Sequence, residues 1–349
     1  MSKSLKARSP RVIKVTGTGG QVVKAELYIF RNGQAVPTSP TYTLEKTIPT
    51  TTTYASFNVS DFARSNISYK KHVDVTTVTD ADVDTYTHMY VKIYINGVFQ
   101  TGDSASYTHE FTCTNGFGYS SEGFNPTIDK PMEGGTYHYH DTDNAGSIYV
   151  YNPQDLTSGD YYIRWSDLGS VTTITTITDF EINQCPAVHP SFIANGNKVE
   201  VFRLTTKVFE ATFEPKCEKM YTPVKVDFVN KQGFWQRVFF FKNSEENISI
   251  DSKNYQSKQD DPEFNYFDKS ETDFNINGRE FITLNTGFVD EDFFEIVKQI
   301  ALSEYIVIDE THTVLIDSKE IKKQTHLTEK TINYKMKFKH SHNTINQRY

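Results

Sequence analysis

The sequence predicts a mainly β protein, with antiparallel sandwich-like domains followed by a C-terminal α+β module that carries one amphipathic helix. Aromatic residues make up 14% of the 349 residues, and such side chains favour sheets over helical bundles. Five Asn-Gly dipeptides punctuate the chain. This pair supplies the two positive φ angles that a type I′ hairpin turn requires. Apolar residues at helical spacing occur clearly in one segment, residues 290–303.

Composition is that of a globular chain, with 37% hydrophobic and 23% charged residues. The basic N-terminus has no apolar core, so we expect no signal peptide. Since no run approaches 18 apolar residues, we also expect no membrane span and a soluble product folded in a cytoplasm. The three cysteines are odd in number and form no CxxC pair, which predicts reduced, mostly buried thiols.

We divide the chain into an N-terminal arm (residues 1–10), an N-terminal β domain (11–126), a middle segment (127–190) and a C-terminal β/α+β domain (191–349). The middle segment alternates weakly and predicts either a small second sheet or an excursion from the first. Residues 59–64 look like a single helical turn within the first domain. Residues 252–272 are polar and charged, which is typical of an exposed loop.

Four of the Asn-Gly pairs lie between β-type runs and predict hairpin turns. These pairs are Asn32-Gly33, Asn96-Gly97, Asn195-Gly196 and Asn277-Gly278.

The predicted helix, residues 290–303, has an apolar face formed by Val289, Phe293, Ile296, Val297 and Ile300. Asp290 is the expected N-cap, because its carboxylate can accept from free N–H groups of the first turn. Short apolar runs precede and follow the helix, and they predict strands on both sides of it.

The last predicted strand has a two-residue period. Tyr334, Met336 and Phe338 fall on one face, and Lys335, Lys337 and Lys339 fall on the other.

Charge is unevenly distributed along the chain. Residues 318–349 carry a surplus of six positive charges, which against a total of −8 leaves −14 for the remainder. Such asymmetry is found in nucleic-acid-binding tails and in basic faces that dock on acidic proteins. Because Lys335, Lys337 and Lys339 alternate with apolar residues inside a strand pattern, we favour protein docking by these lysines over direct nucleic-acid binding.

Chemical motifs are few, and we predict no catalytic, cofactor-binding or metal-ligating residue. His138 and His140 lie two residues apart beside acidic residues, but a zinc site needs a third ligand that no pattern supplies. The acidic runs 80–84 and 141–146 lack the spacing of a calcium-binding loop. No nucleophile motif is present, and nothing selects a carboxylate pair for glycoside cleavage.

Aromatic faces could stack on sugars, so a glycan-binding site is the alternative reading of the aromatic content. Trp165 with Tyr161 and Tyr162 is the candidate contact, and Trp235 is a further exposed-ring candidate.

Several stretches resemble virion structural proteins of tailed bacteriophages that infect Bacteroidetes hosts. They are residues 57–64, 115–126, 224–235 with 239–242, 282–288 with 303–304, and 332–338. The resemblance covers about half of the chain in order and skips residues 127–190. It implies a tail or baseplate component near the tail tip, assembled in symmetric rings, and it offers no catalytic residues to carry over.

The expectation is therefore a non-enzymatic structural subunit of a phage tail. Its partners would be other copies of itself and other tail proteins, and its place would be the virion tail after synthesis in the host cytoplasm. The alternatives are a receptor- or glycan-binding tail module and a tail enzyme that degrades polysaccharide.

Overall fold

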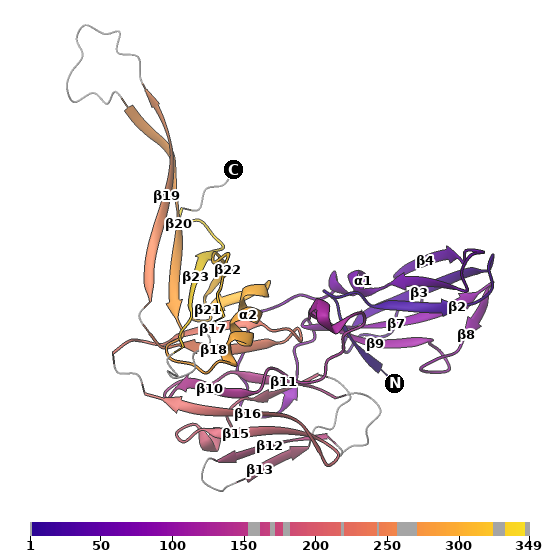
Figure 1. Ribbon diagram of the computed structural model, residues 1–349, viewed down its shortest axis with the longest axis horizontal. Helices are drawn as coiled ribbons and strands as arrows, with labels where there is room; N and C mark the ends of the chain where they lie inside the picture. The colour runs from indigo at the N-terminus through magenta and orange to yellow at the C-terminus, as the bar shows by residue number, and fades with distance from the viewer. Residues whose placement is uncertain are drawn as a thin grey trace.

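The computed structural model describes residues 2–152, 161–167, 172–176, 182–217, 220–242, 244–256, 271–323 and 332–345. The mainly β prediction is confirmed, since strands dominate and the described chain has two α-helices, α1 (Ser60–Arg64) and α2 (Phe293–Leu302). Figure 1 shows an N-terminal lobe beside a body of stacked sheets, with one long hairpin projecting from the body. The helical turn predicted at residues 59–64 is α1.

The N-terminal lobe is a two-layer β structure. Its strands are β1 (Ser2–Lys6), β2 (Val12–Thr16), β3 (Val22–Arg31), β4 (Tyr42–Thr47), β5 (Tyr54–Asn58), β7 (Tyr86–Ile95), β8 (Val98–Gln100) and β9 (His109–Thr114). The larger layer has the order β1-β9-β7-β3-β4, with β8 on β7, and β2 pairs with β5 in the smaller layer. Leu27, Met89 and Phe111 from the large layer share one core with Ile13 and Phe57 from the small layer.

Residues 2–10, the described part of the predicted N-terminal arm (1–10), do not stand apart from the lobe. Ser2–Lys6 is strand β1, which pairs in parallel with β9, and Leu5 is fully buried. The segment has one apolar residue among Ser and Lys, so its own period gives no strand signal. The neighbouring strand β9, more than 100 residues away in sequence, decides its conformation.

One of the four predicted Asn-Gly hairpin turns is a tight hairpin. Asn96 and Gly97 have φ angles of 46° and 80° and join β7 to β8. Asn32-Gly33 lies in the longer connection 32–41, and Asn195-Gly196 follows the 3-10 helix η2 (Pro190–Phe192). Asn277-Gly278 lies inside a strand. The glycine of the pair has a positive φ at positions 33, 97 and 196, but the neighbouring segments decide whether the pair forms a tight hairpin turn.

The middle segment contributes to two sheets, a small one as predicted and a larger one that it shares with later strands. A five-stranded sheet runs β10-β16-β15-β12-β13, from β10 (Gly135–His140), β12 (Tyr161–Asp167), β13 (Thr172–Thr176), β15 (Asn197–Arg203) and β16 (Thr206–Lys216). A three-stranded sheet contains β11 (Ser147–Tyr151), β14 (Ile182–Pro186) and β6 (Thr79–Asp80). The predicted boundary at residue 190 thus crosses a sheet, and β6 reaches the body from the N-terminal half.

The C-terminal sheet has seven strands in the order β18-β17-β21-β22-β23-β20-β19. Their bounds are β17 (Val224–Val229), β18 (Trp235–Phe240), β19 (Glu245–Gln256), β20 (Glu271–Asn285), β21 (Ile306–Ile308), β22 (His312–Ile316) and β23 (Lys335–His340). One hydrophobic cluster contains Phe240 and Phe338 from this sheet together with Trp165 and Phe213 from the five-stranded sheet. The two sheets therefore share a core, and the body behaves as one packed unit.

Helix α2 begins later than predicted. It starts at Phe293, and the N-cap is Asp292, whose side chain makes no capping hydrogen bond. Asp290 instead contributes its backbone oxygen, which accepts from the Phe293 N–H at 3.1 Å. The predicted apolar face is confirmed for Ile296, Val297 and Ile300, which are all buried.

The lobe is fixed to the body where the β17–β18 turn meets the end of β9. Thr114 Oγ1 donates to the Gln232 carbonyl at 2.7 Å, and the Phe117 N–H donates to the Lys231 carbonyl at 2.9 Å. A Cβ built on Gly233 would lie 2.5 Å from the Gly116 nitrogen. Because real Cβ contacts never reach that distance, only glycine permits this approach of two backbones.

A buried ion cluster adds a second connection. The Arg237 side chain is 1% exposed and donates through Nε and Nη2 to both carboxylate oxygens of Asp227, at 2.7 and 2.9 Å. Its Nη1 also donates to Asp74 at 2.7 Å, and its Nη2 to Glu310 at 3.0 Å. Asp74 lies between α1 and β6, so the cluster ties this crossing segment to the C-terminal sheet.

The buried ring of His88 is expected to make the stability of the lobe depend on pH. Its ring lies on β7 among Phe30, Tyr86 and Tyr90, and burial lowers its pKa to about 4. An unfolded His has a pKa of about 6.5, so between pH 4 and 6.5 the unfolded chain binds a proton at this position and the folded chain does not. We expect stability to fall by about 3 kcal/mol as the pH drops from 6.5 to 4. In His88→Phe the slope of unfolding free energy against pH should flatten in this range, and an unchanged slope would contradict the assignment.

Candidate assembly interface

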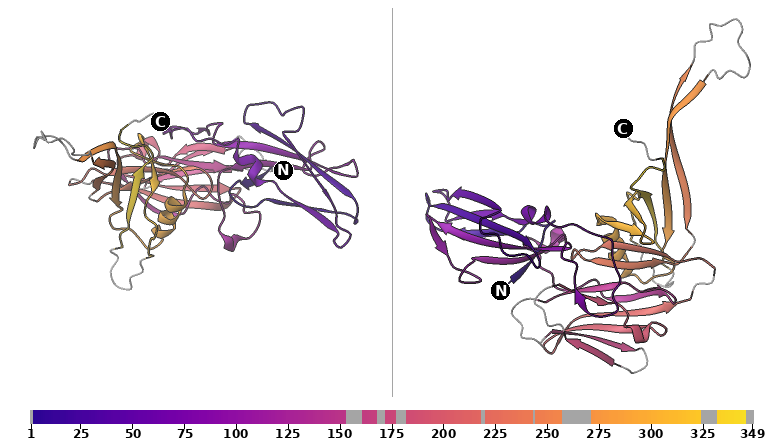
Figure 2. Two further views of the ribbon diagram at one scale, coloured as in Figure 1. Left: turned by 90° about the horizontal axis from the view of Figure 1, so that it is seen from above. Right: turned by 180° about the vertical axis from the view of Figure 1, so that it is seen from behind.

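Strand β19 and the outer part of β20 form an exposed hairpin. All twelve residues of β19 are exposed, and this strand is one edge of the seven-stranded sheet. Figures 1 and 2 show the hairpin standing away from the rest of the molecule. The predicted loop 252–272 begins and ends in strand, because β19 continues to Gln256 and β20 starts at Glu271. Residues 257–270 lie outside the described residues.

Large apolar side chains on this hairpin face water. The exposed fractions are 50% for Ile248, 63% for Ile250, 53% for Tyr255, 42% for Phe274 and 45% for Ile276. A two-stranded ribbon is marginally stable in water on its own. Clustered apolar groups on such a ribbon are typical of a surface that another protein covers.

The base of the hairpin is held by the rest of the sheet. Ile282 pairs with Phe338 and Leu284 pairs with Met336, and all four side chains are buried. Farther out, the Thr344 N–H donates to the Gly278 carbonyl at 2.8 Å. The inner half is therefore anchored on two sides, while the outer half depends on the β19–β20 ladder.

Lys335, Lys337 and Lys339 point away from the core, as the alternation predicted, while Met336 and Phe338 are buried. They do not form an uninterrupted basic patch. Lys337 Nζ lies 3.3 Å from Asp317 and 4.5 Å from the centroid of the Phe281 ring.

The two outer lysines of this row, Lys335 and Lys339, line different clefts. Lys335 lines a cleft of about 260 Å³ that also contains Glu245, and Lys339 lines another of about 560 Å³ that contains Asp251 and Asp317. Acidic groups thus alternate with the lysines over this face. Docking by these lysines remains a prediction.

The predicted glycan contact at Trp165 is wrong. Trp165 is 1% exposed, and its Nε1 donates to the Pro186 carbonyl at 3.0 Å. Tyr161 is also buried, whereas Tyr162 stacks on Phe202 with ring centroids 4.9 Å apart. Along β12 the odd-numbered residues face the core, and the sequence does not reveal which face of a strand will be covered. Trp235 is likewise buried at 4% exposed.

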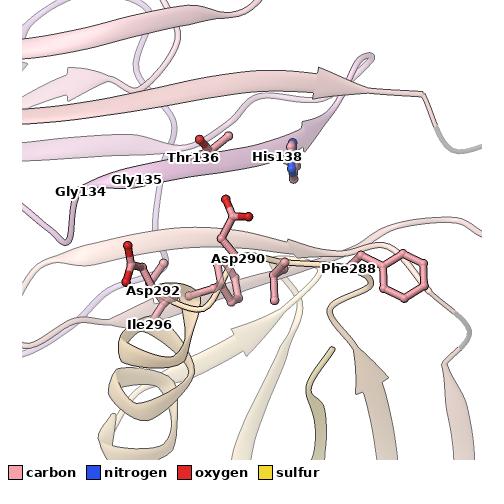
Figure 3. A pocket seen from close by; sticks show the side chains of 10 residues that line it. Gly134, Gly135, Thr136, His138, Phe288, Asp290, Asp292 and Ile296 are labelled. Atoms are coloured by element: carbon pink, nitrogen blue, oxygen red, sulfur yellow. The ribbon is translucent and has the colours of Figure 1, made fainter. Parts of the chain in front are cut away.

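A small polar cleft lies between β10 and the start of α2 (Figure 3). Its volume is about 200 Å³, and Thr136 and His138 from β10 face Asp290 and Asp292 across it. Burial, together with the nearby Lys216, lowers the pKa of His138, although Glu214 and Asp290 act in the opposite direction. The His138 Nδ1 atom is 3.8 Å from the Glu214 carboxylate. The cleft therefore presents one hydroxyl, one imidazole and two carboxylates to any small polar group that enters it.

The acidic runs weighed as calcium ligands are used in protein contacts. Asp84 pairs with Arg31 and Lys70, and Asp143 lies 2.9 Å from Lys225. Within the ranges that the structure describes, no three His, Cys, Asp or Glu side chains are grouped to hold a metal ion.

Cys113 and Cys185 are buried, and burial raises the pKa of both thiols, whereas Cys217 is exposed. Burial of this kind keeps the first two thiols protonated and unreactive.

Neither described α-helix has the length and apolar character needed to cross a bilayer. Comparison with protein-family models gives no match to this chain, and comparison with curated proteins gives none either.

Proposed function

We propose that this protein is a non-enzymatic structural subunit of a phage tail, in the tail tip or baseplate. Copies of the chain and other tail proteins would be its partners, arranged as rings. The proposal rests on the sequence resemblance to phage virion proteins, and the structural observation that supports it most is the exposed β19–β20 hairpin.

The hairpin suits an assembly role because, over its outer half, both the free edge of β19 and the apolar side chains are exposed to water. The side chains of Ile248 and Ile250 are exposed, and their transfer from water to a protein interface would be favourable in free energy. Burial of apolar area is the main favourable term in permanent subunit interfaces. A neighbouring subunit would therefore stabilise the hairpin at the same time as the hairpin holds the neighbour.

The two connections between lobe and body also favour a load-carrying part over a flexible binding module. The Gly116–Gly233 approach holds the lobe against the body, and the Arg237 cluster holds the crossing segment at Asp74 against the C-terminal sheet. The glycan-binding alternative loses its main residue, since the Trp165 ring is covered.

The test is to locate the chain in intact particles of the phage that encodes it. Fab fragments raised against the purified protein would be added to particles and imaged by electron cryomicroscopy. We expect Fab density in a ring at the end of the tail. Particles that lack the protein, or that carry it only on the head, would overturn the proposal.

Reversing the lysine row tests whether Lys335, Lys337 and Lys339 contribute to assembly. The triple variant with Glu at all three positions should keep its fold, because exposed ion pairs contribute only about 0–1 kcal/mol each. We expect complete tails to become rare in micrographs, while the purified variant unfolds within a few degrees of the wild type. Normal yields of complete tails would remove the lysine row from the interface.

A further inference from the structure

The outer edge of β19 is open over its whole length in the described part of the chain, and the orientation of its backbone groups can be deduced. The Gly278 carbonyl accepts from Thr344, on the side of β20 away from β19, at 2.8 Å. The Asn285 carbonyl accepts from Lys242, on the β19 side, at 3.3 Å. The direction of the backbone N–H and C=O groups alternates from one residue to the next along a strand. In this stretch of β20, the backbone N–H and C=O groups of even-numbered residues therefore point away from β19.

The same alternation gives the orientation of the backbone groups of β19. Ile250 is opposite Gly278 and Ile248 is opposite Glu280, so both are non-hydrogen-bonded pairs of the β19–β20 ladder. Their own N–H and C=O groups therefore point to the open edge. Ile248 and Ile250 thus present both free backbone groups and exposed apolar side chains on one strand.

Two of the devices that usually block such an edge, a proline and a bulge in the edge strand itself, are missing from β19, although the strand does carry the charged residues Glu245, Glu246, Asp251 and Lys253. Residues 245–256 contain no proline. The irregularity of the ladder falls on β20, where two residues, including Asn275 at φ 51°, lie opposite Ser252. The strand is therefore regular enough to serve as a template for another strand.

We propose that β19 pairs antiparallel with β19 of a second copy of this chain, about a two-fold axis at Ser249. In this register Ile248 lies opposite Ile250 of the second copy, and both direct their backbone groups toward each other. Glu245 lies opposite Lys253 of the second copy, and the symmetry makes each contact occur twice. Four isoleucines meet on one face and two ion pairs form on the other.

Charge complementarity selects this register. A two-fold axis at Ile248 would place Glu245 opposite Asp251 of the second copy, and like charges directly opposite each other are destabilising. An axis at Ile250 would place Ile248 opposite Ser252 and break up the apolar cluster. The occupant is therefore a second copy, because β19 is complementary to itself in charge and in apolar pattern.

The paired segment, residues 245–253, is short, so the dimer should be reversible rather than permanent. Its formation would join two seven-stranded sheets into one continuous sheet. The inference goes beyond the proposed tail role, since it requires no other phage protein.

Sedimentation velocity of the full chain over a wide concentration range tests the pairing. We expect a reversible monomer–dimer equilibrium. Glu245→Lys and Lys253→Glu should each weaken dimerisation about tenfold, because two cross-strand ion pairs become like-charge contacts. The double variant E245K/K253E should restore the wild-type dissociation constant. Positions 245 and 253 of one chain are eight residues apart, or roughly 26 Å along the strand, which is too far for a direct contact. Rescue by the double variant therefore requires contact between two copies.

Proline substitution tests the edge itself. Ile250→Pro removes an N–H that the β19–β20 ladder does not use, so it should abolish the dimer and leave thermal stability close to that of the wild type. Ser249→Pro is the matched control, because the Ser249 N–H faces β20 and its loss should loosen the hairpin. A wild-type chain that stays monomeric at every concentration would overturn the proposal. A dimer that survives both I250P and the single charge reversals would do the same.

Discussion

Replacing Arg237 with methionine is expected to lower the free energy of unfolding by about 3–5 kcal/mol, because it leaves a buried carboxylate without its partner. Asp227 is 1% exposed and receives two hydrogen bonds from the guanidinium group. Water cannot replace these bonds at that depth. Asp74 and Glu310 are less affected, since their side chains are 23% and 32% exposed and can be hydrated.

Urea unfolding of Arg237→Met, Asp227→Asn and the double variant measures the coupling between the two groups. The double variant should be less destabilised than the sum of the single changes, because the fully buried carboxylate of Asp227 is then no longer left without a partner, and only the partly exposed Asp74 and Glu310 lose the guanidinium group. Arg31→Met is a control of the same chemistry at a surface site, where Arg31 is 41% exposed and Asp84 keeps Lys70. It should cost less than about 1 kcal/mol. An equally small cost for Arg237→Met would show that the cluster contributes little to stability.

Gly233→Ala should destabilise the junction of lobe and body by about 3 kcal/mol or more. Two effects add together: Gly233 has a φ of 88°, and its Cβ would meet the Gly116 nitrogen at 2.5 Å and Thr114 Cβ at 2.8 Å. The first effect alone costs about 1–2 kcal/mol for an L-residue. The second forces two backbones apart and should free the lobe from the β17–β18 turn.

Gly97→Ala separates these two effects. Gly97 has a similar φ of 80°, but a Cβ there meets nothing within 4 Å. Denaturant unfolding gives the difference between the variants, and small-angle X-ray scattering reports whether the lobe has left the body. Equal destabilisation at both glycines, with no change in scattering, would mean that the close approach can relax at little cost.

The junction and the ion cluster are both long-range features, and the sequence contained no local sign of them. Gly233 follows Lys231 and Gln232 in what looks like an ordinary polar turn, and Arg237 lies in a strand-like run. The role of Gly233 depends on Gly116, and the bond from Arg237 to the crossing segment depends on Asp74, each more than 100 residues away, whereas the Arg237–Asp227 pair lies within the β17–β18 hairpin. No period or turn preference carries information over such a separation.

Where the sequence was decisive, short-range physics was sufficient. The alternation of Met336 and Phe338 with lysines follows from the two-residue period of a strand beside a core. The buried face of α2 follows from the helical period, and the Asn96-Gly97 turn follows from the φ angles those residues prefer. The mainly β class came from the same local preferences, summed over the chain.

Tertiary structure alone decided the pairing of strands and the side on which each is covered. It placed Ser2–Lys6 beside β9, merged the middle segment with residues 197–216, and turned the Trp165 ring into the core. It also left β19 with a bare edge. A strand's own residues fix its period, but burial depends on which distant segment supplies the neighbouring surface, and that choice is made only when the whole chain packs.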